Sequence, residues 1–234
     1  MVTQPTTNWF PAHPDNYTAG RADGIVWEGV VIHTTDGGAS LDALGSWFAS
    51  AAARASTHFG IGPDGRIGQF VSLQNTARGH GIKGNPTAAV VLENGSLNPN
   101  DYLIGIELVD NHLPGNHTPE QIEAAARLTA WLFATEILPH AARTGAAVSR
   151  RNIIGHNEID SVNRSRCPSW PPLRWADFVA RVGALVAGEP APVDPRLRDA
   201  IDGLTAIALG LDDLAERAAV QAASVRALAV ELAR

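Results

Sequence analysis

The sequence predicts an α/β fold with a central mixed β-sheet flanked by helices, followed by a heptad-patterned helical tail. Short β-branched runs alternate with segments of helical periodicity across residues 25–188, which is typical of this class. Prolines then cluster in residues 189–195 and indicate a semi-stiff linker. Apolar residues follow a heptad pattern over residues 196–234, as in a helix with an apolar seam. Residues 1–24, polar and rich in turn formers, are expected to form an N-terminal arm.

Apolar runs and turn residues mark the predicted strands. A Pro63-Asp64-Gly65 turn joins two short runs and predicts a hairpin, because these residue types supply the turn geometry. The other strands are expected where continuous apolar runs have the length of a buried strand. The predicted strand ranges are 25–32, 57–61, 66–72, 103–109 and 153–154.

Three helices of the domain are predicted from periodic apolar positions and their end signals. Ser40 precedes the first helix as an N-cap. Thr118 precedes the second, with Gln121 at the capping-box position, and Gly188 ends the third. Residues 74–101 are rich in Gly, Asn and Pro without periodicity. We therefore expect a long loop there, and such loops are more often functional than not.

Composition and charge exclude several classes of protein. The net charge is −6 and no basic run occurs, so nucleic acid is not expected as a partner. No stretch has the ~18 apolar residues that span a bilayer, so stable membrane insertion is not expected. The N-terminus lacks a basic segment followed by an apolar one, so we expect no signal peptide and synthesis in the cytoplasm. A single cysteine excludes an intramolecular disulfide.

Three residues form a candidate metal site. His33 and His156 each end a short apolar run, and Cys167 lies in the segment after His156. Each alone is most often an ordinary core histidine or a buried cysteine. Together they offer two imidazoles and a thiolate, which suit Zn²⁺. Structural zinc sites usually have four protein ligands, so a set of three indicates a hydrolytic site with one open position.

Glu107 is a carboxylate within an otherwise apolar run, Leu103 to Val109. By alternation it shares a face of its strand with Gly105, which leaves space beside it. One interpretation is an edge strand with Glu107 in water. The other is a general base or acid beside the metal, because a buried carboxylate is costly without such a partner.

Five short motifs, in their order along residues 25–185, resemble those of the zinc N-acetylmuramoyl-L-alanine amidases. That family includes peptidoglycan recognition proteins, phage lysis amidases and muropeptide-recycling amidases. Residues 16–21 and the start of the first motif are most similar to lysins of phages with actinobacterial hosts. The motifs are Val-Val-Ile-His33-Thr-Thr, Ser56-Thr57-His58-Phe59, Ile-Gly-Ile-Glu107-Leu, Gly155-His156-Asn-Glu and Cys167-Pro168.

The resemblance implies that His33, His156 and Cys167 hold Zn²⁺. It also implies hydrolysis of the amide bond between N-acetylmuramic acid and the L-alanine of the stem peptide. Some members carry a Tyr where this chain has Thr57, and members without that Tyr carry a Glu at the position of Glu107. The resemblance therefore implies Glu107 as the residue that moves the proton.

Three substrate contacts are expected from the same comparison: Thr57, His80 and Arg166. His80 falls where the family often has a Trp-His-Ala-Gly loop, with an exposed loop histidine as the alternative. Several members have a Lys two residues before the third ligand, where this chain has Ser165 between Arg164 and Arg166. An arginine would then supply the positive charge, and the sequence leaves open which one points inward.

The expected role is a phage lysis enzyme that acts on peptidoglycan after holin-mediated release. The alternatives are a cytosolic muropeptide-recycling amidase and a peptidoglycan-binding module without catalysis. The tail at residues 196–234 favours the lysis enzyme, since a recycling enzyme has little use for an appendage. For the tail itself, a homo-oligomer through self-association, a helix packed back on the domain and cell-wall targeting all stay open.

Overall fold

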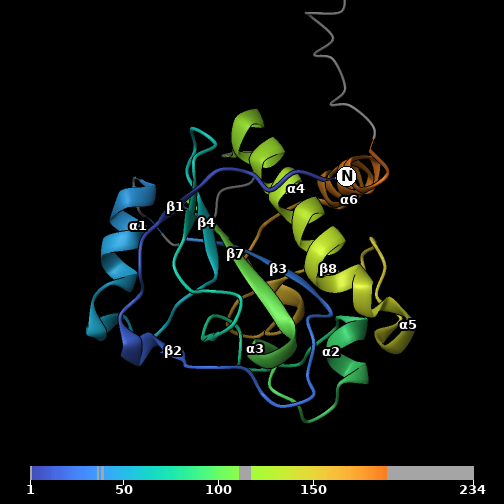
Figure 1. The fold of residues 1–234 in the computed structure, drawn as a ribbon, viewed down its shortest axis with the longest axis horizontal. Helices are drawn as coiled ribbons and strands as arrows, with labels where there is room; N and C mark the ends of the chain where they lie inside the picture. Colours follow the sequence, from blue (N-terminus) through green and yellow to red (C-terminus); the bar gives the residue numbers. More distant parts are fainter. Residues whose placement is uncertain (1, 36, 38–39, 111–116, 189–234) are drawn as a thin grey trace, which may run out of the picture. The chain divides into compact units, whose positions relative to one another are not determined.

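A six-stranded mixed sheet organises the computed structural model, which describes residues 2–35, 37, 40–110 and 117–188 (Figure 1). The strand order in this sheet is β1-β5-β4-β7-β3-β8. A second, two-stranded sheet pairs β2 with β6. The strands are β1 (Thr7–Trp9), β2 (Tyr17–Thr18), β3 (Gly29–Thr34), β4 (Phe59–Ile61), β5 (Ile67–Gln69), β6 (Thr76–Ala77), β7 (Leu103–Leu108) and β8 (Ile153–Gly155).

The helices lie between these strands and after the last one. The described α-helices are α1 (Leu41–Phe48), α2 (Ala89–Glu93), α3 (Pro99–Tyr102), α4 (Pro119–Leu132), α5 (Ala141–Thr144) and α6 (Pro172–Val186). Short 3₁₀ turns lie at Pro14–Asn16, Ala51–Ala53, Leu138–His140 and His156–Glu158, and one π-helical turn at Phe133–Ile137 extends α4.

The centre of the sheet is parallel and its far side is mixed. β3 runs parallel to both β7 and β8, and β7 runs parallel to β4. β4 and β5 form the predicted antiparallel hairpin, and β1 from the N-terminal arm adds to β5 in parallel. A mixed sheet flanked by helices is therefore present as predicted.

Different helices cover the two faces of the sheet. Alternate residues of β3 and β7, including Ile32 and Ile106, pack into one core with α4 and α6, which lie side by side (Figure 1). The intervening residues, including Val31 and Leu103, pack on the other face with α2 and α3. By alternation His33 and Glu107 share this second face with Val31 and Leu103.

The predicted helix starts are confirmed. The Ser40 hydroxyl accepts a hydrogen bond from the Ala43 amide at 3.1 Å at the start of α1. The Thr118 hydroxyl likewise accepts from the Gln121 amide at 3.0 Å at the start of α4. These side chains satisfy amides that have no partner within the helix.

Two expectations about the chain path are wrong. The segment 74–101 is not a plain loop, because it contains β6, α2 and all but the last residue of α3. These elements have two to five residues, too few to show a periodic pattern. The strand predicted from Ile25 is β3, which begins at Gly29. Gly29 suits close strand contact there, since a Cβ would lie 2.3 Å from the carbonyl oxygen of Asn152.

The predicted linker at 189–195 and the heptad tail at 196–234 lie outside the described residues. Among the helices that the structure describes, none is both long enough and apolar enough to cross a membrane.

Candidate metal centre and active site

Two histidines meet where parallel strands end. β3 and β8 pair in register with Ile32 opposite Gly155, so His33 and His156 follow at the same edge of the sheet. Their ring centroids lie 4.5 Å apart. This proximity follows from parallel pairing, because the carboxyl ends of parallel strands lie together.

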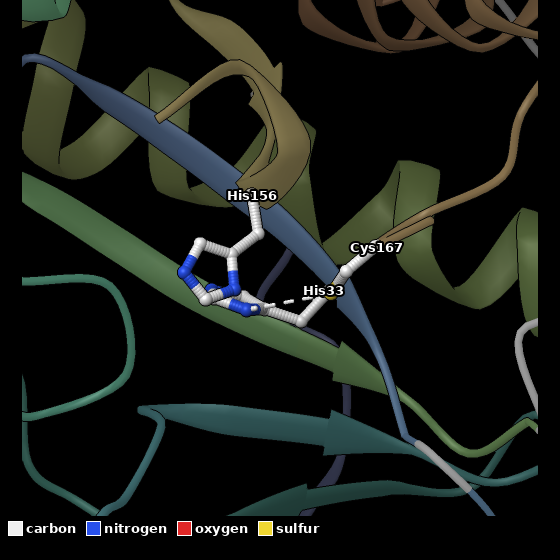
Figure 2. A group of neighbouring side chains, drawn as sticks. All are labelled: His33, His156 and Cys167. Atoms are coloured by element: carbon white, nitrogen blue, oxygen red, sulfur yellow. Dashed lines mark hydrogen bonds between the residues drawn. The ribbon is translucent and has the colours of Figure 1, made fainter. Parts of the chain in front are cut away.

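Cys167 reaches the same edge from the segment that follows His156. The thiol accepts a hydrogen bond from the Thr34 amide at 3.3 Å, next to His33 on β3. The Asn157 amide donates to the carbonyl of Cys167 at 2.7 Å, which folds the segment back on the start of the 3₁₀ turn. Figure 2 shows the three side chains pointing toward one another, and their candidate ligand atoms all lie within 4.8 Å of one another.

The protonation states of this set fit a zinc ion. Burial lowers the pKa of His33 well below its ordinary value and that of His156 to about 4, so both rings are neutral and able to ligate. Burial, and then the charge of Glu107, raises the pKa of the Cys167 thiol to about 12. A bound divalent cation reverses that preference and favours the thiolate. Two imidazoles and one thiolate are ligands that zinc accepts.

Glu107 lies directly beside this set. It is the residue of β7 that pairs with His33 of β3, and β7 is a central strand between β4 and β3. The edge-strand interpretation is therefore wrong. Burial raises the pKa of Glu107 to about 8, while the positive charge of Arg164 opposes that rise. The side chain is partly exposed and lines a cavity, so its carboxylate can reach a bound molecule.

A cavity of about 390 Å³ opens over the ligands and Glu107. The segment 163–166 forms one wall, and Ser56 and Gly79 contribute to another. A second cavity of about 460 Å³ shares Glu107 and Phe48 with the first and continues along α1. The two cavities are neighbours, because both are lined by Glu107, and together they offer more room than a single sugar or amino acid needs.

The structure places the three predicted substrate residues differently. Arg166 lines the cavity over the ligands, as does Arg164. Thr57 and His80 are both about 1% exposed and lie outside that lining. His80 contacts His33, with 3.2 Å between His33 Nε2 and His80 Nδ1. Substrate contact by Thr57 and His80 stays a prediction.

Arg164 was recognisable in the sequence only as a neighbour of the position where the family has Lys. In the structure its charge acts on the pKa of Glu107 and on that of His156. Side-chain direction in an irregular segment follows no period, so the sequence contains no signal that separates Arg164 from Arg166.

A buried polar cluster holds the chain just beyond Cys167. Trp170 donates its indole N–H to His117 Nδ1 at 3.2 Å. His117 Nε2 lies 2.9 Å from a carboxylate oxygen of Asp110, and both side chains are almost fully buried. The Thr35 hydroxyl donates a hydrogen bond to the backbone carbonyl of Asp110 and accepts one from the backbone amide of Asp110. The cluster therefore ties the segment of the third candidate ligand to the ends of β7 and β3.

Comparison with known proteins agrees with this geometry. A family model described as N-acetylmuramoyl-L-alanine amidase matches residues 23–170. No curated protein matches the chain. Similar solved structures include a mutant endolysin from Bacillus subtilis, at 20% identity over 76% of this chain and 99% of that chain, with a TM-score of 0.50. An AmpD derivative has 23% identity over 74% of this chain and 93% of that chain, with a TM-score of 0.52. The PlyG catalytic domain has 13% identity over 82% of this chain and 99% of that chain, with a TM-score of 0.52.

Proposed function

The chain belongs to the N-acetylmuramoyl-L-alanine amidase family, whose members hydrolyse an amide bond of peptidoglycan, and from this premise we propose that it does so with zinc. The observation that carries the proposal is the convergence of His33, His156, Cys167 and Glu107 at one cavity. The bond is the amide between N-acetylmuramic acid and the L-alanine of the stem peptide.

The division of labour follows from the positions of the side chains. Zinc, held by His33, His156 and Cys167, would polarise the amide carbonyl and lower the pKa of water toward ~7. Glu107, on the strand beside His33, accepts the proton of the attacking water and passes it to the leaving nitrogen. A carboxylate with a raised pKa suits this double task, because it both takes and returns a proton near neutral pH.

We assign to Arg164 the stabilisation of the negative charge that develops on the carbonyl oxygen. Arg164 lines the cavity, and its positive charge acts on the pKa values of Glu107 and His156. Arg166, which lines the same cavity, is proposed to bind the substrate. A guanidinium offers a fork of donors and keeps its proton at any pH in use, so it stabilises charge without acting as an acid.

Mass analysis of peptidoglycan digests tests the bond directly. New L-alanine amino termini are expected, together with glycan strands free of peptide. Products cut within the glycan or within the stem peptide would contradict the proposal. Binding of the protein to sacculi without any release of peptide would favour a binding module.

For the biological role we propose a phage lysis enzyme, made in the cytoplasm and released to the cell wall through a holin. The similar structures include both an endolysin and AmpD, and the heptad tail favours the former. The purified protein should solubilise intact sacculi as well as small muropeptides. Activity confined to small soluble muropeptides would instead support the recycling amidase.

We also propose that residues 196–234 mediate self-association through their apolar seam. Light scattering should then give a particle mass that is a multiple of the chain mass for the full-length protein, and the mass of a single chain for a variant ending at Gly188. The mass of a single chain for both proteins would contradict this.

A further inference from the structure

His80 lies against His33 in the core, with ring centroids 5.3 Å apart. His80 Nδ1 is 3.2 Å from His33 Nε2, and His80 Nε2 is 3.2 Å from the carbonyl oxygen of Leu103. We propose that His80 is a positioning residue that fixes the tautomer and orientation of His33, so that His33 presents Nδ1 to the metal. This inference rests on the zinc site of the proposed function.

The proton positions follow from the hydrogen-bond partners. The carbonyl of Leu103 only accepts, so His80 Nε2 must carry a proton and donate it. In a neutral imidazole the other nitrogen then accepts, so the proton between the rings belongs to His33 Nε2. This leaves His33 Nδ1 without a proton and with a lone pair for a metal.

The direction of the free nitrogen agrees with this assignment. His33 Nδ1 is 4.0 Å from Cys167 Sγ. A tetrahedral ion with a zinc–nitrogen distance of about 2.0 Å and a zinc–sulfur distance of about 2.3 Å holds such atoms about 3.5 Å apart, so Nδ1 faces the thiol and a shift of about half an ångström would bring both to one ion. Metal-bound histidines usually donate their second nitrogen to a carbonyl, carboxylate or water. In this chain a second histidine occupies that place and passes the hydrogen bond on to a β7 carbonyl.

The local structure holds His80 firmly in this position. Its amide donates to the Asn100 side chain at 2.9 Å. In the preceding loop the Arg78 amide donates to the Ser56 hydroxyl, and the Ser56 amide donates to the Arg78 carbonyl. Gly105 lies against the ring, since a Cβ there would be 3.3 Å from His80 Cε1. His80 is about 1% exposed, so water does not compete for its hydrogen bonds to His33 and Leu103. These two hydrogen bonds are therefore a fixed part of the core.

The first test needs no substitution. Nitrogen-15 spectra of histidine side chains in the zinc-free, full-length protein should show His33 and His80 both protonated on Nε2 only. Adding zinc should then shift His33 Nδ1 and leave its Nε2 proton in place. A proton on His33 Nδ1 in the zinc-free protein, or zinc attached through Nε2, would overturn the proposal.

The second test measures zinc affinity by competition with a chromophoric chelator. His80→Phe keeps a ring but removes both hydrogen bonds, and the dissociation constant for zinc should rise roughly 10- to 100-fold. His80→Gln can accept from His33 and donate to Leu103, so it should recover most of the affinity. The visible spectrum of the Co²⁺-substituted protein should change in His80→Phe and return in His80→Gln.

His58→Phe is the matched control, because His58 is an equally buried histidine that bonds to Gly105 and not to His33. It should lower stability and leave zinc affinity within about threefold, well below the loss expected when the hydrogen-bond partner of a metal ligand is removed. Equal zinc affinity and Co²⁺ spectra in His80→Phe and the parent would overturn the proposal. Absence of zinc binding by the parent would instead overturn the proposed function, and if His80→Phe does not fold, the nitrogen-15 spectra decide.

Discussion

His33 and Glu107 are direct partners across the parallel ladder between β3 and β7. Neighbouring strands lie about 4.8 Å apart, so the backbone of two central strands holds the carboxylate beside the first candidate ligand. A pair placed by strand register keeps its geometry better than a pair carried by loops. The proposed division between metal binding and proton transfer can therefore be tested one side chain at a time.

Glu107→Gln should remove proton transfer and preserve the metal site. We expect kcat to fall roughly 100- to 10,000-fold, with zinc content and the cavity unchanged, because glutamine has the same shape without a basic oxygen. Steady-state kinetics and metal analysis measure both. Glu120→Gln, an exposed carboxylate at the start of α4, should be neutral, and an unchanged kcat in Glu107→Gln would remove this residue from the mechanism.

Cys167→Ser should weaken zinc binding and abolish hydrolysis, because it replaces a thiolate ligand with a hydroxyl that rarely ionises. In the parent, zinc at 100 times its dissociation constant should add about 2.7 kcal/mol to the free energy of unfolding. A chelator should thus lower the Tm of the parent and leave that of Cys167→Ser nearly unchanged. Parent-like zinc content and activity in the variant would show that the ligand assignment is wrong.

Arg164→Gln and Arg166→Gln separate charge stabilisation from substrate binding. Loss of Arg164 should lower kcat roughly 100- to 1,000-fold, as for loss of one donor to a developing oxyanion. It should also move the acidic limb of the pH–rate profile to higher pH, because the charge of Arg164 lowers the pKa of Glu107. Arg166→Gln should act mainly on KM. The reverse pattern in the two variants would exchange their roles.

The zinc-free protein should lose stability as pH rises, because of Glu107. Its pKa in the folded protein, about 8, lies above the ordinary value of 4.5. Below pH 4.5 both folded and unfolded chains carry the proton, so the group has no effect there. Between these two values only the unfolded chain ionises, and the free energy of unfolding falls until the folded pKa is passed.

Glu107→Gln removes this loss, and comparison with the parent cancels the contributions of the histidines and Cys167. We expect the variant to gain stability over the parent from pH 5 to 8, on the order of 1–3 kcal/mol at the upper end. The lower part of that range is favoured because the carboxylate is partly exposed to the cavity. Urea unfolding in the presence of a chelator measures it, and a gain that shrinks with rising pH would contradict the raised pKa.

Much of the fold and of the metal set was predictable because it depends on local patterns. Ser40 and Thr118 cap helices through their own side chains, and this needs no distant contact. His33 and Glu107 follow from strand alternation, which places side chains on a face whatever the strand pairs with. The short elements within 74–101 were not predictable, because a helix of one turn is stabilised by packing and not by its own propensity.

The sequence by itself determined which residue types stand at the strand ends and on which face Glu107 lies. Only the tertiary structure decided that β3 and β7 pair with His33 opposite Glu107, that Arg164 acts on the pKa of Glu107, and that His80 bonds to His33. Register and loop direction result from long-range packing between segments far apart in the chain. No local period encodes them, and so they become visible only when the whole domain is assembled.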